Sequence, residues 1–215
     1  MAAVTGAPLS VPGCSLDHMV NERDAVVRDE DWYARELGPG TTYTGCTFYD
    51  TDWTEVANEG AVFDACTFSG VRFNASRHIG AAFTNCSFRK CGFFDTRFEQ
   101  CKLVGSRFEQ STFGLLEATG GDWSFADLRG ADLRKAGFDG VRLREADLTG
   151  TRLEGASLIR CDLSGALLHG ARLKGADLRG SDLSSLDPRT VEAAGARIDL
   201  EQAAVIATAL GYEVG

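Results

Sequence analysis

A bulky apolar residue recurs at every fifth position from Tyr43 to Leu183. Of the 29 positions in this register, leucine fills 12, phenylalanine 11, tryptophan two and tyrosine one. The exceptions are Asn58, His78 and Ala118. A period of five matches neither the 3.6-residue period of a helix nor the two-residue period of a flat strand. The pattern therefore predicts an array of repeats, in which each repeat buries its apolar face on its neighbours.

A small residue lies two positions before the bulky one, and a glycine lies two positions after it in 14 pentads. One large inward group, one small inward group and a turn residue describe one side and one corner of a square coil. Four sides close a turn of 20 residues, and successive turns stack at roughly the 4.8 Å spacing of paired strands. Residues 41–185 then form about seven turns of an all-β solenoid.

Residues 20 apart should therefore form columns inside the coil. One column starts with four phenylalanines at Phe48, Phe68, Phe88 and Phe108, and continues with leucine from Leu128. Neighbours in a column match in size, as stacked side chains at interior packing density require. Six of the seven cysteines share the small inward position, which predicts packing rather than metal binding.

Segments flank the array on both sides. Residues 1–40 are interpreted as an N-terminal extension and cap, and residues 41–198 as the repeat array. Asp187-Pro188 predicts a short helix, because aspartate caps a helix and proline suits its first turn. In residues 199–215, Asp199 and Gln202 predict a capping box. This second helix is apolar nearly all round, so we expect one side on the array and the other on a second copy. The residues expected at this homodimer interface are Leu200, Val205, Ile206 and Leu210.

The residues suggest no enzyme. Three histidines without a nucleophile constellation form no triad, and no phosphate-binding or zinc-binding motif is present. Asn58 and His78 lie one coil apart, so we expect them to hydrogen-bond to each other or to backbone rather than to hold a metal. We therefore predict no cofactor and no metal site.

The net charge of −9 is unevenly distributed. Residues 1–40 contribute −4, residues 41–198 contribute −2 and residues 199–215 contribute −3. This acidity argues against direct nucleic-acid binding and favours attraction to a basic, DNA-binding protein surface. No apolar run approaches the length of a membrane span, and the first residues lack a secretory signal, so we expect a cytoplasmic protein.

Carboxylates occupy the outward position just before several bulky residues. In a square coil they fall on two adjacent sides, one with Asp122, Asp162 and Asp182 and one with Asp127 and Asp147. Arginines and lysines gather on a neighbouring side, at Arg72, Arg134, Lys135, Arg152, Arg172 and Lys174. The five aspartates are the candidate partner-binding residues. The alternative is that mixed charges simply solvate the wall.

Repeats such as Ala126-Asp127-Leu128-Arg129-Gly130 resemble the pentapeptide-repeat family, over about residues 40–198. Its fold is a right-handed quadrilateral β-helix. The segments 58–63, 76–78, 82–88 and 195–203 are similar to the mycobacterial-type fluoroquinolone-resistance branch. That resemblance implies a DNA-mimicking homodimer that binds DNA gyrase and protects it from quinolone-type poisons. The unbroken register implies that this chain lacks the projecting loops of plasmid-borne relatives.

Two alternatives remain open. One is a self-immunity factor against a gyrase-poisoning natural product. The other is a non-catalytic scaffold that binds another protein through apolar residues expected to be exposed, namely Phe94, Leu115, Leu116, Phe125 and Leu167.

Overall fold

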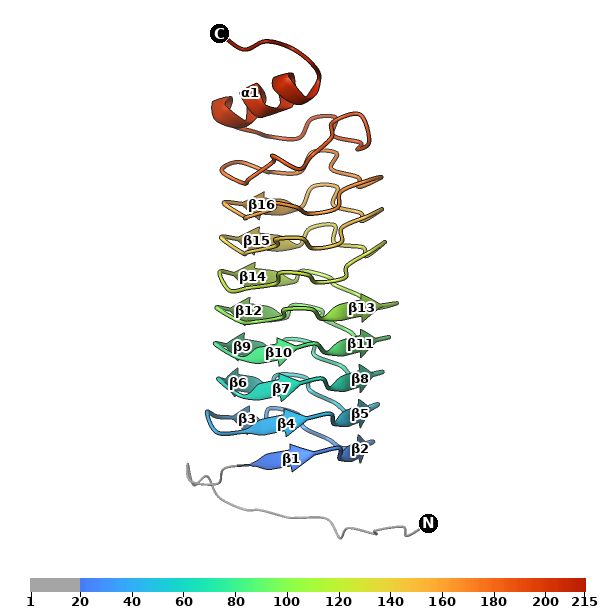
Figure 1. Cartoon of the computed structure of the whole chain (residues 1–215). Coiled ribbons are helices and arrows are strands. Elements are labelled where there is room, and N and C mark those ends of the chain that lie inside the picture. The colour runs from blue at the N-terminus through green and yellow to red at the C-terminus, as the bar shows by residue number, and fades with distance from the viewer. Residues whose placement is uncertain (1–19) are drawn as a thin grey trace.

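The computed structural model describes residues 20–215, which form one four-sided parallel β-solenoid with a C-terminal helix (Figure 1). The expected all-β fold is confirmed. Each residue pairs with the residue 20 positions later, as in Phe63 with Phe83. Within residues 20–215, no helix is long and apolar enough to cross a membrane.

The four sides are numbered here from the one that carries Tyr43. Side 1 is a sheet of β1 (Asn21–Arg23), β4 (Thr42–Thr44), β7 (Val62–Asp64) and β10 (Ala82–Thr84). Side 2 is a sheet of β2 (Val26–Arg28), β5 (Thr47–Tyr49), β8 (Thr67–Ser69), β11 (Ser87–Arg89) and β13 (Arg107–Glu109). Side 4 is a sheet of β3 (Glu36–Leu37), β6 (Ala57–Glu59), β9 (Arg77–Ile79), β12 (Arg97–Glu99), β14 (Glu117–Thr119), β15 (Gly137–Asp139) and β16 (Ser157–Ile159). Side 3 consists of isolated bridges, such as Arg72 with Gly92.

The bulky residue of each pentad points inward and forms columns along the axis. In the first half these columns are parallel aromatic stacks, with Phe68 lying 4.9 Å from Phe48 and 4.9 Å from Phe88 between ring centroids. Rings from adjacent sides meet edge to face, an arrangement that aromatic quadrupoles favour. In the second half leucines fill the same positions. The core is therefore one continuous column of side chains.

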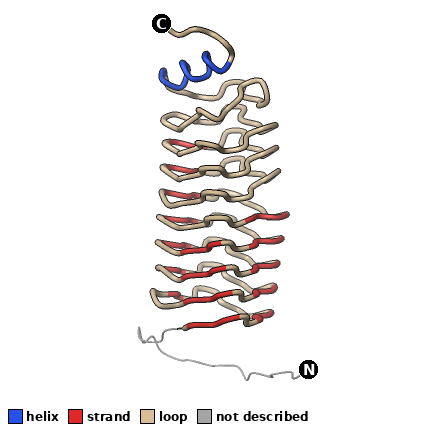
Figure 2. Tube along the Cα trace, in the orientation of Figure 1, coloured by secondary structure: helices blue, strands red, loops and turns tan. Residues whose placement is uncertain are grey.

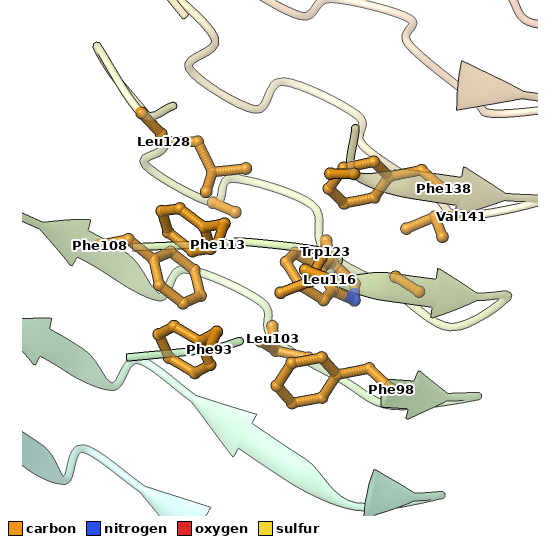
Figure 3. Close-up of a cluster of buried hydrophobic side chains, with 14 of the residues drawn as sticks. Phe93, Phe98, Leu103, Phe108, Phe113, Leu116, Trp123, Leu128, Phe138 and Val141 are labelled. Atoms are coloured by element: carbon orange, nitrogen blue, oxygen red, sulfur yellow. The ribbon is translucent and has the colours of Figure 1, made fainter. Parts of the chain in front are cut away.

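A size exchange explains the third exception in the register. Ala118 occupies a bulky position, and Leu116 occupies the small inward position of the same pentad, where it is fully buried. The indole of Trp123 fills the space beside Ala118 and meets Phe98 and Phe138 edge to face (Figure 3). Leu116 is therefore a core residue, and its expected place on the surface was wrong.

The array begins earlier than the sequence suggested. Strands β1, β2 and β3 form a complete first turn that pairs with β4, β5 and β6. The pairing offset here is 21 residues, as between Leu37 and Asn58, because the Gly38–Thr41 corner holds one extra residue. Residues 20–40 thus belong to the coil, so the expected boundary at residue 41 is corrected. Residues 1–19 of the expected extension lie outside the described residues.

The array also continues through the segment expected to be a short helix. Glu192 pairs with Arg172, and the Glu192 N–H donates to Ala171 O at 3.0 Å, so this backbone extends the ladder. Only helix α1 (Leu200–Ala209) is present among the described residues (Figure 2). Its expected capping box is confirmed, because Asp199 and Gln202 exchange side-chain to backbone hydrogen bonds of 2.9 and 2.8 Å.

The two polar exceptions, Asn58 and His78, form a buried hydrogen-bond chain. Asn58 Oδ1 accepts from the Ala61 N–H, so its amide nitrogen donates to His78 Nδ1 at 3.2 Å. Ser76 Oγ donates to the Phe73 carbonyl, so His78 Nε2 donates to Ser76 Oγ at 2.9 Å. Complete burial lowers the pKa of His78 to about 3. Both side chains are thus satisfied within the core, as the structural interpretation predicted.

The repeat-phase cysteines are inward and buried, and none forms a disulfide within the described residues. Burial raises the pKa of the Cys91 thiol to about 12, which keeps it protonated and unreactive.

Candidate protein-binding surface

The five candidate aspartates lie on two adjacent sides of the second half of the solenoid. Asp122 and Asp162 flank Arg142 on side 1, and Asp182 follows one turn later. Asp127 and Asp147 are direct neighbours on side 2. The structure thus places the candidates around one edge of the rod, with an arginine interrupting the side 1 row.

The position of each aspartate within its pentad has a local cause. Each carboxylate accepts a hydrogen bond from the backbone N–H two residues later, as in Asp122 with Ser124 (3.0 Å) and Asp147 with Thr149 (3.0 Å). This Asx turn helps the chain round the corner. The pKa of Asp182 is lowered because the Ser184 hydroxyl and N–H both stabilise its charged form. The pattern therefore has a structural role in addition to any role in binding.

Arginines accompany four of the five carboxylates. Asp122 pairs with Arg142 at 2.8 Å, and Asp127 pairs with Arg129 at 2.7 Å. Arg129 also lies 3.4 Å from Asp147, while Arg144 lies 4.0 Å from Asp162. Burial alone would raise the pKa of Asp122, but hydrogen bonds from Ser124 and Arg142 outweigh it and hold the pKa below its usual value. Asp182 forms no ion pair with any residue from 20 to 215.

The edge between sides 1 and 2 carries an exposed aromatic ring. Phe125 lies between Asp122 and Asp127 in the chain and is 55% exposed. Its backbone has a φ of 61° and is fixed by a 2.9 Å hydrogen bond from its N–H to the Arg144 carbonyl. The candidate surface therefore combines carboxylates with one large apolar side chain, which aspartate spacing alone did not indicate.

The net negative charge lies elsewhere. Residues 20–71 carry 11 acidic and three basic side chains, which gives −8, and these residues build the first turns. Residues 72–215 carry 19 acidic and 19 basic side chains, which gives zero. The five aspartates thus lie on a part of the rod that is neutral overall, and the acidic excess lies at its N-terminal end.

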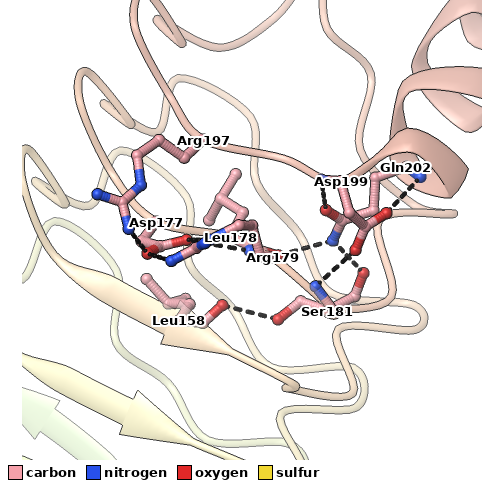
Figure 4. Close-up of polar contacts among 9 residues, drawn as sticks. Leu158, Asp177, Leu178, Arg179, Ser181, Arg197, Asp199 and Gln202 are labelled. Atoms are coloured by element: carbon pink, nitrogen blue, oxygen red, sulfur yellow. Dashed lines mark hydrogen bonds and ion pairs between the residues drawn. The ribbon is translucent and has the colours of Figure 1, made fainter.

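Helix α1 covers the last turn of the coil and leaves apolar groups exposed. Gln202 is buried, and its Nε2 donates to the Leu178 and Ser181 carbonyls at 2.6 and 2.7 Å (Figure 4). Ile206 packs against the solenoid core. The other three candidate interface residues, Leu200, Val205 and Leu210, are exposed. The chain itself therefore partly covers Ile206, whereas the remaining three form an apolar surface on the C-terminal end.

Comparisons with known proteins agree with this architecture. The family model for pentapeptide repeats matches residues 118–150 and 146–184. A second family model, for the SV2A/B/C luminal domain, matches residues 38–113. No curated protein matches the sequence.

Two solved structures are similar in fold. HetL from the cyanobacterium Nostoc sp. strain PCC 7120, a pentapeptide repeat protein involved in heterocyst differentiation regulation, is 20% identical with a TM-score of 0.64, and the match covers 83% of this chain and 87% of HetL. Trypsin-treated QnrB1, a plasmid-mediated fluoroquinolone resistance protein, is 22% identical with a TM-score of 0.53, and the match covers 91% of this chain and 100% of QnrB1. Because the five-residue register also continues through the matched segments, the chain belongs to the pentapeptide-repeat family.

Proposed function

We propose that this chain is a non-catalytic protein that binds DNA gyrase and protects it from fluoroquinolone-type poisons. The support is the solenoid fold, which is similar to that of a fluoroquinolone resistance protein, and a surface whose carboxylates gather on two adjacent sides. The sequence resemblance to the gyrase-binding branch points the same way. A net charge of −9 also favours a partner that is basic.

The mechanism follows from charge and shape. Duplex DNA offers one negative charge per roughly 1.7 Å of its axis, and a DNA-binding surface is basic to match it. A rod with carboxylates along one edge competes for such a surface. The ion pairs described above add one requirement, because Arg129 and Arg142 must exchange their carboxylate partners for solvent or for acidic groups of gyrase. Exposed ion pairs contribute roughly 0–1 kcal/mol each, so this exchange costs little.

The observation that carries the proposal is that Asp122, Asp127, Asp147, Asp162 and Asp182 lie around the same edge of the rod, where Phe125 projects. Aromatic residues are common binding hot spots, so we assign Phe125 to the same gyrase-binding surface. Asp182, which has no arginine partner, is the carboxylate most readily available to a basic group.

Inhibition of gyrase supercoiling, with and without a fluoroquinolone, tests this surface. The double variant Asp127→Lys/Asp147→Lys should abolish inhibition and protection. Asp132→Lys is the matched control, because Asp132 has the same pentad position and an arginine partner but lies on side 3. Loss of activity in both variants, or in neither, would contradict the assignment.

We also propose that the functional unit is a homodimer joined through α1. A two-fold axis would bring Leu200, Val205 and Leu210 of one protomer against the same residues of its partner, which removes exposed apolar surface from water. Leu200→Asp/Leu210→Asp should sediment as a monomer at micromolar concentration, whereas the wild type should be a dimer. A monomeric wild type would refute this.

A further inference from the structure

Two large apolar side chains lie together on the edge between sides 3 and 4. Phe94 and Leu115 are 55% and 48% exposed, and they occupy neighbouring turns. This edge is diagonally opposite the edge that carries Phe125, because the two edges are separated by two sides in each direction. The pair is therefore separate from the proposed gyrase-binding surface.

The surface around the pair is unusually free of side chains. Between residues 41 and 198, the glycines without a left-handed backbone are Gly92, Gly114 and Gly137, and these lie around Phe94 and Leu115. An ordinary backbone accepts any residue, so turn geometry does not explain these glycines. A Cβ on Gly114 would lie 3.0 Å from Phe94 Cδ2, so glycine here allows the ring to lie against the wall. Glycine in an extended segment often marks the close approach of another backbone.

The backbone holds the apolar pair in place at some cost. The Phe94 N–H donates to Asn74 Oδ1 at 3.1 Å, which fixes the start of the corner. Leu115 has a φ of 58°, a region that disfavours L-residues by roughly 1–2 kcal/mol. An exposed leucine in this conformation adds little to folding stability, so its retention points to contact with another molecule.

The charges beside the pair are positive once internal ion pairs are removed. Asp95 and Glu117 both pair with Arg97, at 3.9 and 3.5 Å. Lys135 occupies the corner one turn beyond Leu115 and forms no ion pair with any residue in 20–215. A free cation beside an apolar pair, on a chain of net charge −9, complements a ligand that is apolar and acidic.

We propose that Phe94, Leu115 and the three glycines form a second docking surface for an extended, acidic segment of a partner protein. An apolar side chain of that segment packs between Phe94 and Leu115. Its backbone approaches over Gly92 and Gly114, and a neighbouring carboxylate binds Lys135. This surface would leave the gyrase-binding edge free, so the rod could hold two partners at once.

Selection from a random 12-residue peptide library displayed on phage tests the proposal with the full-length protein as the target. The enriched peptides should combine an aromatic or branched aliphatic residue with neighbouring aspartate or glutamate. Synthetic versions should bind Phe94→Ser about tenfold or more weakly than wild type, as expected for an interface hot spot. Gly114→Val should also weaken binding, because its side chain displaces the Phe94 ring.

Phe125→Ser is the matched control, since it removes an equally exposed phenylalanine from the opposite edge. It should leave peptide affinity unchanged, and Lys135→Glu should reduce it. Unchanged circular dichroism of each variant establishes that the fold is intact. Peptides that bind Phe94→Ser as tightly as wild type, a selection that yields basic sequences, or no enrichment over Phe94→Ser would each overturn the proposal.

Discussion

The two halves of the solenoid share one register but use different interiors. From Trp32 to Phe113, aromatic rings stack between successive turns and most sides form three-residue strands. From Leu128 onward, leucines fill most of the columns, and most of the ladder consists of isolated bridges. The same four-sided coil therefore tolerates either filling, provided that neighbouring turns match in size.

The corners differ in the opposite sense. In the first half many left-handed corners carry residues other than glycine, such as Ala75 and Gln100. In the second half glycine dominates, as at Gly150, Gly165 and Gly170. A left-handed non-glycine residue is strained. The first half thus combines stronger interior contacts with more strained corners, and the second half combines weaker interior contacts with relaxed ones.

The largest effect should come from truncating the two interiors in the same column. Phe68→Ala should destabilise by about 4 kcal/mol, and Leu148→Ala by about 3 kcal/mol, because a buried ring leaves the larger cavity. Equilibrium denaturation measures both. A larger loss for Leu148→Ala would contradict the view that the aromatic stacks are the stronger interior.

Acidification should affect the first half through His78. Its pKa is about 3 when folded and about 6.5 when unfolded, so the folded state binds fewer protons between these values. Stability is therefore complete above pH 6.5 and falls as the pH decreases towards 3, by roughly 3 kcal/mol between pH 7 and pH 4.

His78→Phe, which continues the column formed by Phe98, should remove this contribution to the pH dependence. The comparison uses the slope of unfolding free energy against pH, so a uniform loss of stability does not affect it. An unchanged slope would show that His78 does not titrate as its burial requires.

Corner substitutions should produce effects of about 1 kcal/mol with opposite signs in the two halves. Gly150→Ala should destabilise, although its new Cβ would meet no atom within 4 Å, because its φ is 65°. Ala75→Gly, at a φ of 54°, should stabilise by relieving strain. Thermal unfolding of the two variants checks the signs, and equal signs would refute the account of the corners.

The smallest effect should come from exposed ion pairs. Arg134→Gln removes the pair with Asp132, whose side chains are 47% and 42% exposed. The loss should be about 0.5 kcal/mol or less, and should vanish at high salt. A loss above about 1.5 kcal/mol would mean that the surface charges are essential to folding.

The five-residue register predicted most of the fold, because it records the inward side chains directly. It did not locate the first turn, since the extra residue at the Gly38–Thr41 corner shifts Trp32 and Leu37 out of phase. It also placed a helix after Asp187, where the local capping signal is real but only forms a turn, with Thr190 N–H bonded to the Asp187 carbonyl. The adjacent coil decides the outcome there, and local sequence does not contain it.

The candidate site was predictable in position but not in environment. The pentad phase placed the five aspartates on adjacent sides. Their partners were less evident, because Arg142 pairs with Asp122 across a 20-residue interval. The contribution of Gly92 and Gly114 to an open surface was also hidden, since most other glycines of the array are corner residues.

Direct binding to purified DNA gyrase at low and moderate salt tests the proposed function most directly. The account predicts saturable binding that weakens steeply as salt rises, because charged groups on the rod replace DNA phosphates. Asp127→Lys/Asp147→Lys should not bind, and Asp132→Lys should bind as the wild type does. Absence of binding at low salt, or equal binding by both variants, would contradict it.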